Sequence, residues 1–139
     1  MRHRTSGFSL LEVMVCMVIL TVAITIFIGS VAQNVRLEAM NAETNVALHA
    51  ASSIIENVHT MTYAEVTSVT LPATFAAEGA TTDGRTLQLI TSTGSTVVGH
   101  VSILENAPQT KKTVEVLVTW RCATGQDRSI MLMTELTNY

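Results

Sequence analysis

An uncharged run from Val13 to Ala32 is the feature that most constrains how this chain can fold. The run has about the length that a helix needs to cross the hydrocarbon layer of a bilayer, roughly 20 residues. Glu12 stands directly before it, and between Phe8 and Ala32 the only other ionisable group is the thiol of Cys16. A carboxylate near hydrocarbon costs about 2.5 to 3.5 kcal/mol on insertion scales, so an acid there is by default functional. The run therefore predicts a membrane helix, and Glu12 is its first candidate functional residue.

A short basic segment, residues 1–7 (MRHRTSG), precedes the run. The positive-inside rule places Arg2 and Arg4 in the cytoplasm and directs the rest of the chain outward. An ordinary secretory signal has its small-residue cleavage site after the apolar core, whereas here Gly7 comes before it. Cleavage at Gly7 would leave the membrane helix attached to the mature protein.

The stretch GFSLLEVMV, which begins at Gly7, resembles the class III signal of type IV pilins and type II secretion pseudopilins. The resemblance implies that a prepilin peptidase/N-methyltransferase cleaves after Gly7 and methylates the new amino terminus at Phe8. It also implies that Glu12 pairs with the amino terminus of a neighbouring subunit. The residues agree with this chemistry, because glycine leaves room for a protease and Phe8 lies one helical turn before Glu12. The alternative is an uncleaved signal anchor whose Glu12 contacts lipid headgroups.

One continuous helix is predicted from Phe8 to about Met61, because this stretch has no proline and Gly29 is its only glycine. At 1.5 Å per residue it would be about 80 Å long, so its second half must lie outside the membrane. There, apolar residues recur every three or four positions, which predicts an amphipathic helix covered by a sheet. The apolar stripe is Val35, Ala39, Ala42, Val46, Ala50, Ile54, Val58 and Met61, and the polar face is Arg36, Glu38, Glu43, Asn45, His49, Glu56 and His59.

Strands and loops are predicted after Met61, where the composition shifts to Thr, Ser, Val and Gly. Strands are predicted at 66–71, 86–91, 96–105, 111–121 and 128–136, a long loop at 73–85, and turns at 92–95 and 122–127. Alternation in 111–121 predicts that Val114 to Trp120 pack one face on the helix. On the last strand, Met131 and Met133 face away from Ile130, and we favour core packing over a contact between subunits. The hairpin VTW…RSIMLMT also resembles, more loosely, the last hairpin of minor pilins.

Several classes of function are disfavoured by the sequence. Lys and Arg number 8 against 11 Asp and Glu, for a net charge of −3, without the basic cluster that nucleic acid requires. The adjacent Lys111 and Lys112 predict a solvated turn.

A cysteine in the bilayer cannot meet one in a soluble head, so no disulfide is expected between Cys16 and Cys122. We find no catalytic motif, and therefore expect neither an enzyme nor a cofactor. Asp83 and Asp127 are too few for a calcium site, and no metal is predicted.

The predicted architecture is α+β, a pilin-like long amino-terminal helix packed on a small antiparallel sheet. We expect a cleaved leader at 1–7, a transmembrane and filament-core segment at 8–33, an amphipathic segment at 34–62 and a sheet with loops at 63–139. The predicted location is the bacterial inner membrane, with the leader in the cytoplasm and the head in the periplasm, and afterwards a periplasmic or extracellular filament.

The predicted function is that of a minor pilin-like structural subunit of a type IV pilus, which primes assembly or lies at the tip. The short head and the final hairpin favour this interpretation. A minor pseudopilin of type II secretion is the close alternative, and a single-span envelope protein with a binding head is the more distant one. Expected partners are the prepilin peptidase, other pilin or pseudopilin subunits, an inner-membrane assembly platform and, before assembly, lipid.

Overall fold

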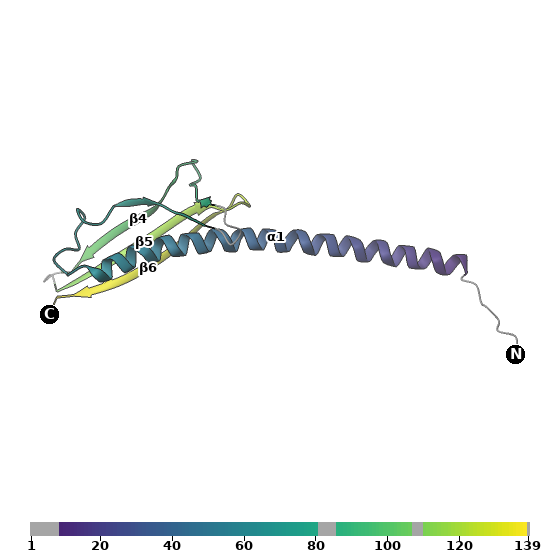
Figure 1. The fold of residues 1–139 in the computed structure, drawn as a ribbon, viewed down its shortest axis with the longest axis horizontal. Helices are drawn as coiled ribbons and strands as arrows, with labels where there is room; N and C mark the ends of the chain where they lie inside the picture. Colours follow the sequence, from purple (N-terminus) through teal and green to yellow (C-terminus); the bar gives the residue numbers. More distant parts are fainter. Residues whose placement is uncertain (1–8, 81–85, 107–109, 139) are drawn as a thin grey trace. The chain divides into compact units, whose positions relative to one another are not determined.

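The described residues form one long helix and six strands. The structure, a computed structural model, describes residues 9–80, 86–106 and 110–138. In chain order the elements are α1 (Leu10–Thr60), β1 (Thr74–Ala76), β2 (Glu78–Ala80), β3 (Thr86–Gln88), β4 (Val97–Glu105), β5 (Lys111–Arg121) and β6 (Asp127–Thr137) (Figure 1). The predicted α+β architecture is confirmed. Contacts divide the described residues into two compact units, the first ending at Leu37 and the second beginning at Glu38.

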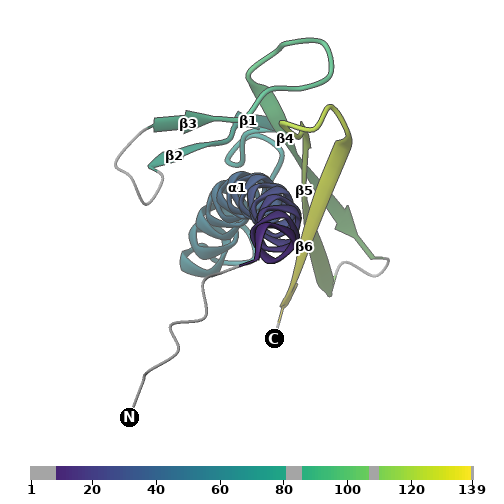
Figure 2. The same ribbon diagram turned by 90° about the vertical axis from the view of Figure 1, so that its right-hand side faces the viewer.

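The second unit is built on a four-stranded sheet in the order β1-β4-β5-β6, with every neighbouring pair antiparallel. The strands β2 and β3 form a separate antiparallel pair. Figure 2 shows β5 and β6 alongside α1, and β2 and β3 over another side of the helix. The approach of β2 is close, because a Cβ added to Gly79 would lie 3.3 Å from a methyl carbon of Val46. The sheet and the β2-β3 pair thus bury the same stretch of helix.

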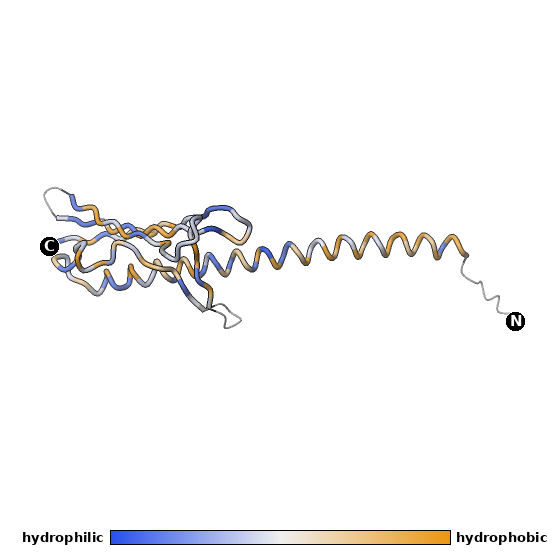
Figure 3. The backbone as a smooth tube through the Cα atoms, turned by 90° about the horizontal axis from the view of Figure 1, so that it is seen from above, coloured by the Kyte–Doolittle hydropathy of each residue, from blue (hydrophilic) through white to orange (hydrophobic). Residues whose placement is uncertain are grey.

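The first unit contains α1 from Leu10 to Leu37, and each of its described side chains is exposed. The colouring of Figure 3 shows a hydrophobic trace over most of this segment. Thr21 and Thr25 fit such a helix because each hydroxyl donates to a carbonyl one turn earlier, at 2.7 and 2.8 Å. The helix continues through Gly29. The prediction of an uninterrupted helix is therefore confirmed for Leu10–Thr60, while Phe8 lies outside the described residues.

Strand β5 supplies the centre of the core. Val114, Val116, Val118 and Trp120 are all buried, which confirms the face predicted from their alternation. Opposite them, Ala47 and Ala51 of α1 are fully buried. Their small side chains let the backbone of the helix approach the sheet, so the core is held by close packing of valine against alanine.

The predicted helix stripe is confirmed in its second half, where Val46 and Val58 are buried and Ala50, Ile54 and Met61 pack against the core. It is wrong at its start, because Val35 and Ala39 are exposed. The buried surface also extends to the adjacent face with Ala47, Ala51 and Glu43, which we placed on the polar face. Spacings of three and four residues are compatible with two adjacent helix faces, and both faces contain alanines that could pack against the sheet. The sheet covers the face where Ala47 and Ala51 permit the closest contact, and this choice brings Glu43 inside.

The strand predicted at 66–71 is wrong, because this segment forms turns. The amides of Thr70 and Leu71 donate to the carbonyl oxygen of Thr67, and the hydroxyl of Thr70 donates to the carbonyl oxygen of Glu65. Threonine hydroxyls that bond to nearby backbone compete with strand pairing. Val66 and Leu71 are nevertheless buried, so they anchor a turn to the core.

The loop predicted at 73–85 is also wrong where it is described, because it contains β1 and β2. The strand β1 depends on a partner far along the chain, with Thr74 opposite His100, whereas β2 pairs with the next strand, Glu78 opposite Gln88. The turn expected at Asp83 and Gly84 lies outside the described residues. The strand β3 ends at Gln88, earlier than the predicted Thr91.

The remaining strands agree with the prediction. The structure has β4, β5 and β6 within one residue of the predicted limits. Both predicted turns are present, and each places a glycine in the left-handed region, Gly94 at φ 80° and Gly125 at φ 82°. These turns could be predicted because their geometry is local.

Candidate functional site

The candidate residues of the amino-terminal motif fall at the start of α1. Gly7 and Phe8 lie outside the described residues, so their geometry is not described. Glu12 is in the first turn of the helix, where the positive end of the helix dipole favours a negative charge. Its side chain is exposed, and it has no hydrogen-bond or ion-pair partner among the residues that the structure describes. A partner for Glu12 is therefore to be sought outside this set of residues.

The helix around Glu12 presents apolar side chains in every direction. Leu10, Val18 and Phe27 are 77%, 64% and 69% exposed, and residues between them are similarly open. This helix is long and apolar enough to cross a membrane, with a mean hydropathy of 2.7 over its most apolar window. A helix that is hydrophobic all round requires a membrane or an assembly to cover it.

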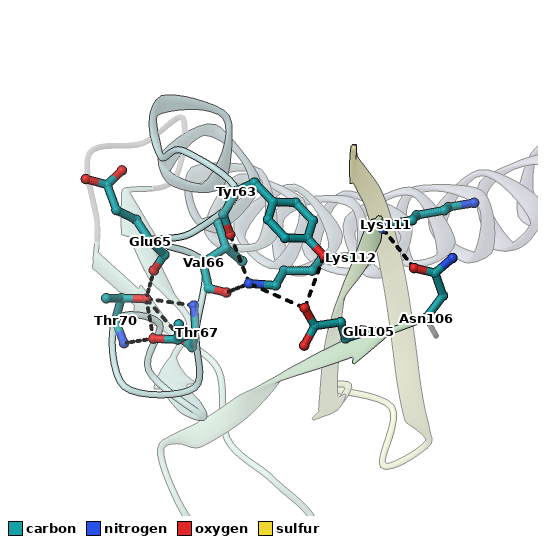
Figure 4. A network of polar contacts seen from close by, with 9 residues as sticks. All are labelled: Tyr63, Glu65, Val66, Thr67, Thr70, Glu105, Asn106, Lys111 and Lys112. Atoms are coloured by element: carbon teal, nitrogen blue, oxygen red, sulfur yellow. Dashed lines mark hydrogen bonds and ion pairs between the residues drawn. The ribbon is translucent and has the colours of Figure 1, made fainter. Parts of the chain in front are cut away.

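Lys112 is a buried cation in the second unit (Figure 4). Its ammonium group donates to the carbonyl oxygens of Tyr63 and Val66, both at 2.9 Å, and lies 3.9 Å from Glu105 Oε1. It also lies 4.4 Å from the ring centroid of Tyr63. The prediction of a solvated lysine pair is wrong for Lys112, because strand alternation sends neighbours to opposite faces. Lys111 faces outward and pairs with Glu135 at 2.7 Å.

Tyr63 and Glu105 complete the surroundings of Lys112. The hydroxyl of Tyr63 donates to Glu105 Oε1 at 3.0 Å. Burial, the hydrogen bond to Glu105 and the charge of that carboxylate, in this order, raise the pKa of Tyr63. The phenol therefore remains a donor to Glu105 throughout the neutral range.

Glu43 of α1 is a buried carboxylate that lies near the carboxyl end of β5, whereas Lys112 lies at its amino end. Its Oε2 accepts a hydrogen bond from the indole N–H of Trp120 at 3.3 Å, and its Oε1 accepts one from the amide of Ala123 at 3.0 Å. The carboxylate thus joins α1 to the turn between β5 and β6. Trp120 is a core residue as predicted, and 3% exposed.

Both ends of β5 are consequently tied to α1 or to the turn that follows it. The helix rises about 26 Å from Glu43 to its end at Thr60, just before Tyr63, at 1.5 Å per residue. The strand extends about 26 Å from Lys112 to Trp120, at 3.3 Å per residue. Since the two spans are similar, the two buried charges hold helix and strand in one register. Neither residue was predicted to be buried. The signals for it were the position of Glu43 one turn before Ala47 and the position of Lys112 on the strand face of Val114 and Val116.

Residues 2–28 match the family model of the prokaryotic N-terminal methylation motif. The chain carries the class III signal of type IV pilins and pseudopilins. This signal indicates processing by prepilin peptidase, N-methylation and assembly with other subunits, and the apolar helix fits a transmembrane anchor. The motif therefore supports a structural subunit of the pilin or pseudopilin type. No curated protein and no solved structure matches the chain.

The two cysteines, two of the histidines and Asp127 make few contacts with other side chains. Cys16 is exposed, Cys122 is buried, and both are free thiols. His100 is exposed on β4, and His59 Nε2 lies 3.3 Å from the hydroxyl of Thr134. No group of three potential metal-binding side chains occurs within the described ranges. Asp127 lies at the start of β6, whereas Asp83 is outside those ranges.

Proposed function

We propose that the chain is a minor pilin-like subunit of a type IV pilus, acting in assembly priming or at the filament tip. The observation that carries this proposal is the methylation motif at residues 2–28 leading directly into a helix with an apolar surface all round. A membrane anchor needs such a surface, and so does a helix in the core of a filament. The proposed parts are a leader at 1–7, an anchor and filament-core segment at 8–33, an amphipathic segment at 34–62 and a head at 63–139.

In the proposed cycle, the subunit waits in the bacterial inner membrane with its leader in the cytoplasm and its head in the periplasm. Cleavage after Gly7 gives a new amino group at Phe8, which is then methylated. The subunit meets an assembly platform in the inner membrane, leaves the lipid and enters a periplasmic or extracellular filament. There its helix exchanges contacts with lipid for contacts with other helices.

Glu12 is the proposed assembly contact, with the amino group of Phe8 in a neighbouring subunit as its partner. Opposite charges are weakly screened in apolar surroundings, so a paired subunit is favoured over an unpaired one. The exposed position of Glu12 in the first turn of α1 leaves its carboxylate available for such a partner.

The outer face of the sheet supports lateral contacts between heads. Met131 and Met133 are 55% and 58% exposed, so our expectation that they pack in the core is wrong. Met131 lies directly opposite Leu117 in the β5-β6 ladder, and Leu117 is 37% exposed. Methionine suits an adaptable contact surface. We propose that these three side chains face a neighbouring subunit, the alternative that we initially disfavoured.

A minor pseudopilin of type II secretion is the second candidate, because the same motif occurs in both systems. Deleting and restoring the gene separates the two. Loss of surface filaments identifies the pilus subunit, while loss of protein secretion with normal filaments identifies the pseudopilin.

Mass spectrometry of the membrane-extracted protein tests the common part of both proposals. In cells with prepilin peptidase, the mature chain should begin at a methylated Phe8, and a Gly7→Val variant should retain the leader. A Gly29→Ala variant is the control, because nothing lies within 4 Å of a Cβ added there. An intact leader on the unaltered chain would instead support a single-span envelope protein.

A further inference from the structure

The strand β6 forms one edge of the four-stranded sheet, and β5 is its only strand partner among the described residues (Figure 1). The β5-β6 ladder runs without a register shift over all 11 residues of β6. The opposite edge differs, because β1 has 3 residues, begins two residues after Pro72 and contains a register shift between Phe75 and Ala76. Short strands, bulges and prolines hinder an edge from pairing with another chain. The edge formed by β6 has none of these features.

Two hydrogen bonds at the ends of the ladder fix which main-chain groups of β6 point toward β5. The amide of Cys122 donates to the carbonyl oxygen of Gln126 at 2.8 Å, and the amide of Asn138 donates to that of Thr110 at 2.9 Å. In an antiparallel ladder, every second residue bonds to the neighbouring strand and the residues between point away from it. Even-numbered residues of β6 therefore bond to β5. The N–H and C=O groups at the open edge belong to Asp127, Ser129, Met131, Met133, Glu135 and Thr137.

The centre of this open edge is available to another strand. Residues 129–134 contain no Lys, Arg, Asp, Glu or Pro, the residues by which edge strands commonly exclude a further strand. Within the described part of the chain, no hydrogen bond uses the outward main-chain groups of Ser129, Met131 and Met133. Glu135, at the end of this stretch, is already paired with Lys111 at 2.7 Å. An extended chain can therefore approach the middle of β6 and satisfy its open donors and acceptors.

The face of β6 that lies on the core side of the sheet is only half covered. Ile130 and Leu132 are half-buried, whereas Val118 and Val116, directly opposite them on β5, are fully buried. The strand β5 has neighbours on both sides, while β6 has one. A further strand with apolar side chains at alternate positions would cover this surface.

Arg128 indicates the charge of the chain that this edge accepts. By strand alternation it lies on the same face as Ile130, and it is half-buried. Its guanidinium has no hydrogen-bond or ion-pair partner among the described residues. All neighbouring strands of this sheet are antiparallel, and a further antiparallel strand would pass Arg128 near its own carboxyl end. Opposite charges on directly opposite residues stabilise a strand pair, so an acidic residue fits there.

We propose that β6 binds an extended segment of a partner protein as a further antiparallel strand of the sheet. The segment has apolar side chains at alternate positions, an uncharged centre and an acidic residue near its carboxyl end. Its main chain bonds to Ser129, Met131 and Met133, and its acid pairs with Arg128. In such strand addition, main-chain hydrogen bonds supply the affinity and side chains the specificity. The contact lies in the plane of the sheet, so it is distinct from the proposed contact of the methionine side chains on the outer face.

The probe is the peptide Val-Thr-Val-Thr-Val-Thr-Glu, acetylated and amidated so that its ends carry no charge. In antiparallel pairing its glutamate lies opposite Arg128. The ¹⁵N-labelled full-length chain is prepared in phosphocholine micelles, and amide exchange is followed by NMR. Without peptide, the outward amides of Ser129, Met131 and Met133 should exchange fast and the amides between them slowly. With the peptide at about ten times its dissociation constant, exchange of the outward amides should slow roughly tenfold.

Variants separate pairing at the edge from contact with the outer face. Met133→Pro removes an N–H that the fold does not use and should weaken peptide binding by roughly tenfold or more, whereas Met133→Ala keeps this N–H and should bind within about twofold of the unaltered chain. Arg128→Gln should weaken binding roughly two- to fivefold. Leu117→Lys is the matched control and should not change binding, because Leu117 lies opposite Met131 on the same face but on the interior strand β5. Thermal unfolding checks that each variant is folded.

Several results would overturn the proposal. One is the absence of a saturable effect of the peptide on the outward amides, and another is an equal effect of a peptide N-methylated at its threonines, which cannot donate to β6. A third is equal weakening by Leu117→Lys and folded Met133→Pro, which would place the peptide on the outer face. If Met133→Pro does not fold, unchanged binding by Arg128→Gln decides against the proposal. Protection of these amides that rises with protein concentration, without peptide, would assign the edge to a second copy instead.

Discussion

Two glutamates on the same helix have opposite surroundings. Glu43, in the second unit, is 8% exposed, and both of its carboxylate oxygens accept hydrogen bonds from the β5-β6 hairpin and its turn. Glu12, in the first unit, is exposed and has no such partner among the described residues. An acid satisfied within the chain stabilises the fold, whereas an acid kept beside an apolar surface is available to another molecule. This contrast fits the proposal that Glu43 serves folding and Glu12 serves assembly.

The largest expected effect comes from Glu12→Ala. This change should leave membrane insertion and thermal unfolding of the head unaltered, but strongly reduce incorporation into filaments, because the amino group of Phe8 loses its proposed partner. Incorporation is measured by immunoblotting sheared filaments against membrane fractions. Normal incorporation of this variant would remove the proposed distinction between the two acids.

Lys112→Met should cause the largest loss of stability within the head. The change leaves the carbonyl oxygens of Tyr63 and Val66 without their buried donor and should lower the free energy of unfolding by about 3 kcal/mol. Denaturant unfolding followed by Trp120 fluorescence measures it. Lys111→Met is the adjacent control, since its exposed pair with Glu135 contributes at most about 1 kcal/mol. Equal losses in both variants would contradict the buried role of Lys112.

Glu43→Ala should destabilise the head, whereas Glu12→Ala should leave the stability of the head unaltered. It leaves the indole N–H of Trp120 and the amide of Ala123 unpaired, so we expect a loss of about 2 kcal/mol in the free energy of unfolding. Glu43→Gln retains an acceptor and should lose less. Glu38→Ala, at an exposed position on the same helix, is the control and should change stability by less than about 0.5 kcal/mol.

The smallest expected effect concerns Glu65, just beyond α1. Hydrogen bonds from the amide and the hydroxyl of Thr62, at 2.7 and 2.8 Å, lower the pKa of Glu65. Because the folded pKa lies below the unfolded value, this stabilisation is present above the unfolded pKa and is lost as the pH falls through the folded pKa. Thermal unfolding should show Glu65→Gln slightly less stable than the unaltered chain at neutral pH. The difference should disappear in acid, and a difference independent of pH would exclude this origin.

The hairpin of β5 and β6 illustrates how far local pattern reaches. Alternation of valines with polar residues predicted both the limits of β5 and its buried face, and Thr124-Gly125 predicted the turn. The pattern failed for Val66 to Leu71, where threonine hydroxyls bond to nearby backbone. It failed also for the three-residue strands β1 and β2, which are too short for an alternating pattern, and β1 pairs with β4 far along the chain.

The sequence by itself determined the membrane-like run, the class III signal and the long helix, since each depends on composition or on neighbouring residues. It also singled out Glu12, because an acid beside an uncharged run can be recognised without a fold. Only the tertiary structure decided that the buried surface of α1 extends to Ala47 and Ala51, and that Glu43 and Lys112 have partners inside the head. A buried charge depends on partners supplied by distant segments, and no local pattern specifies those partners.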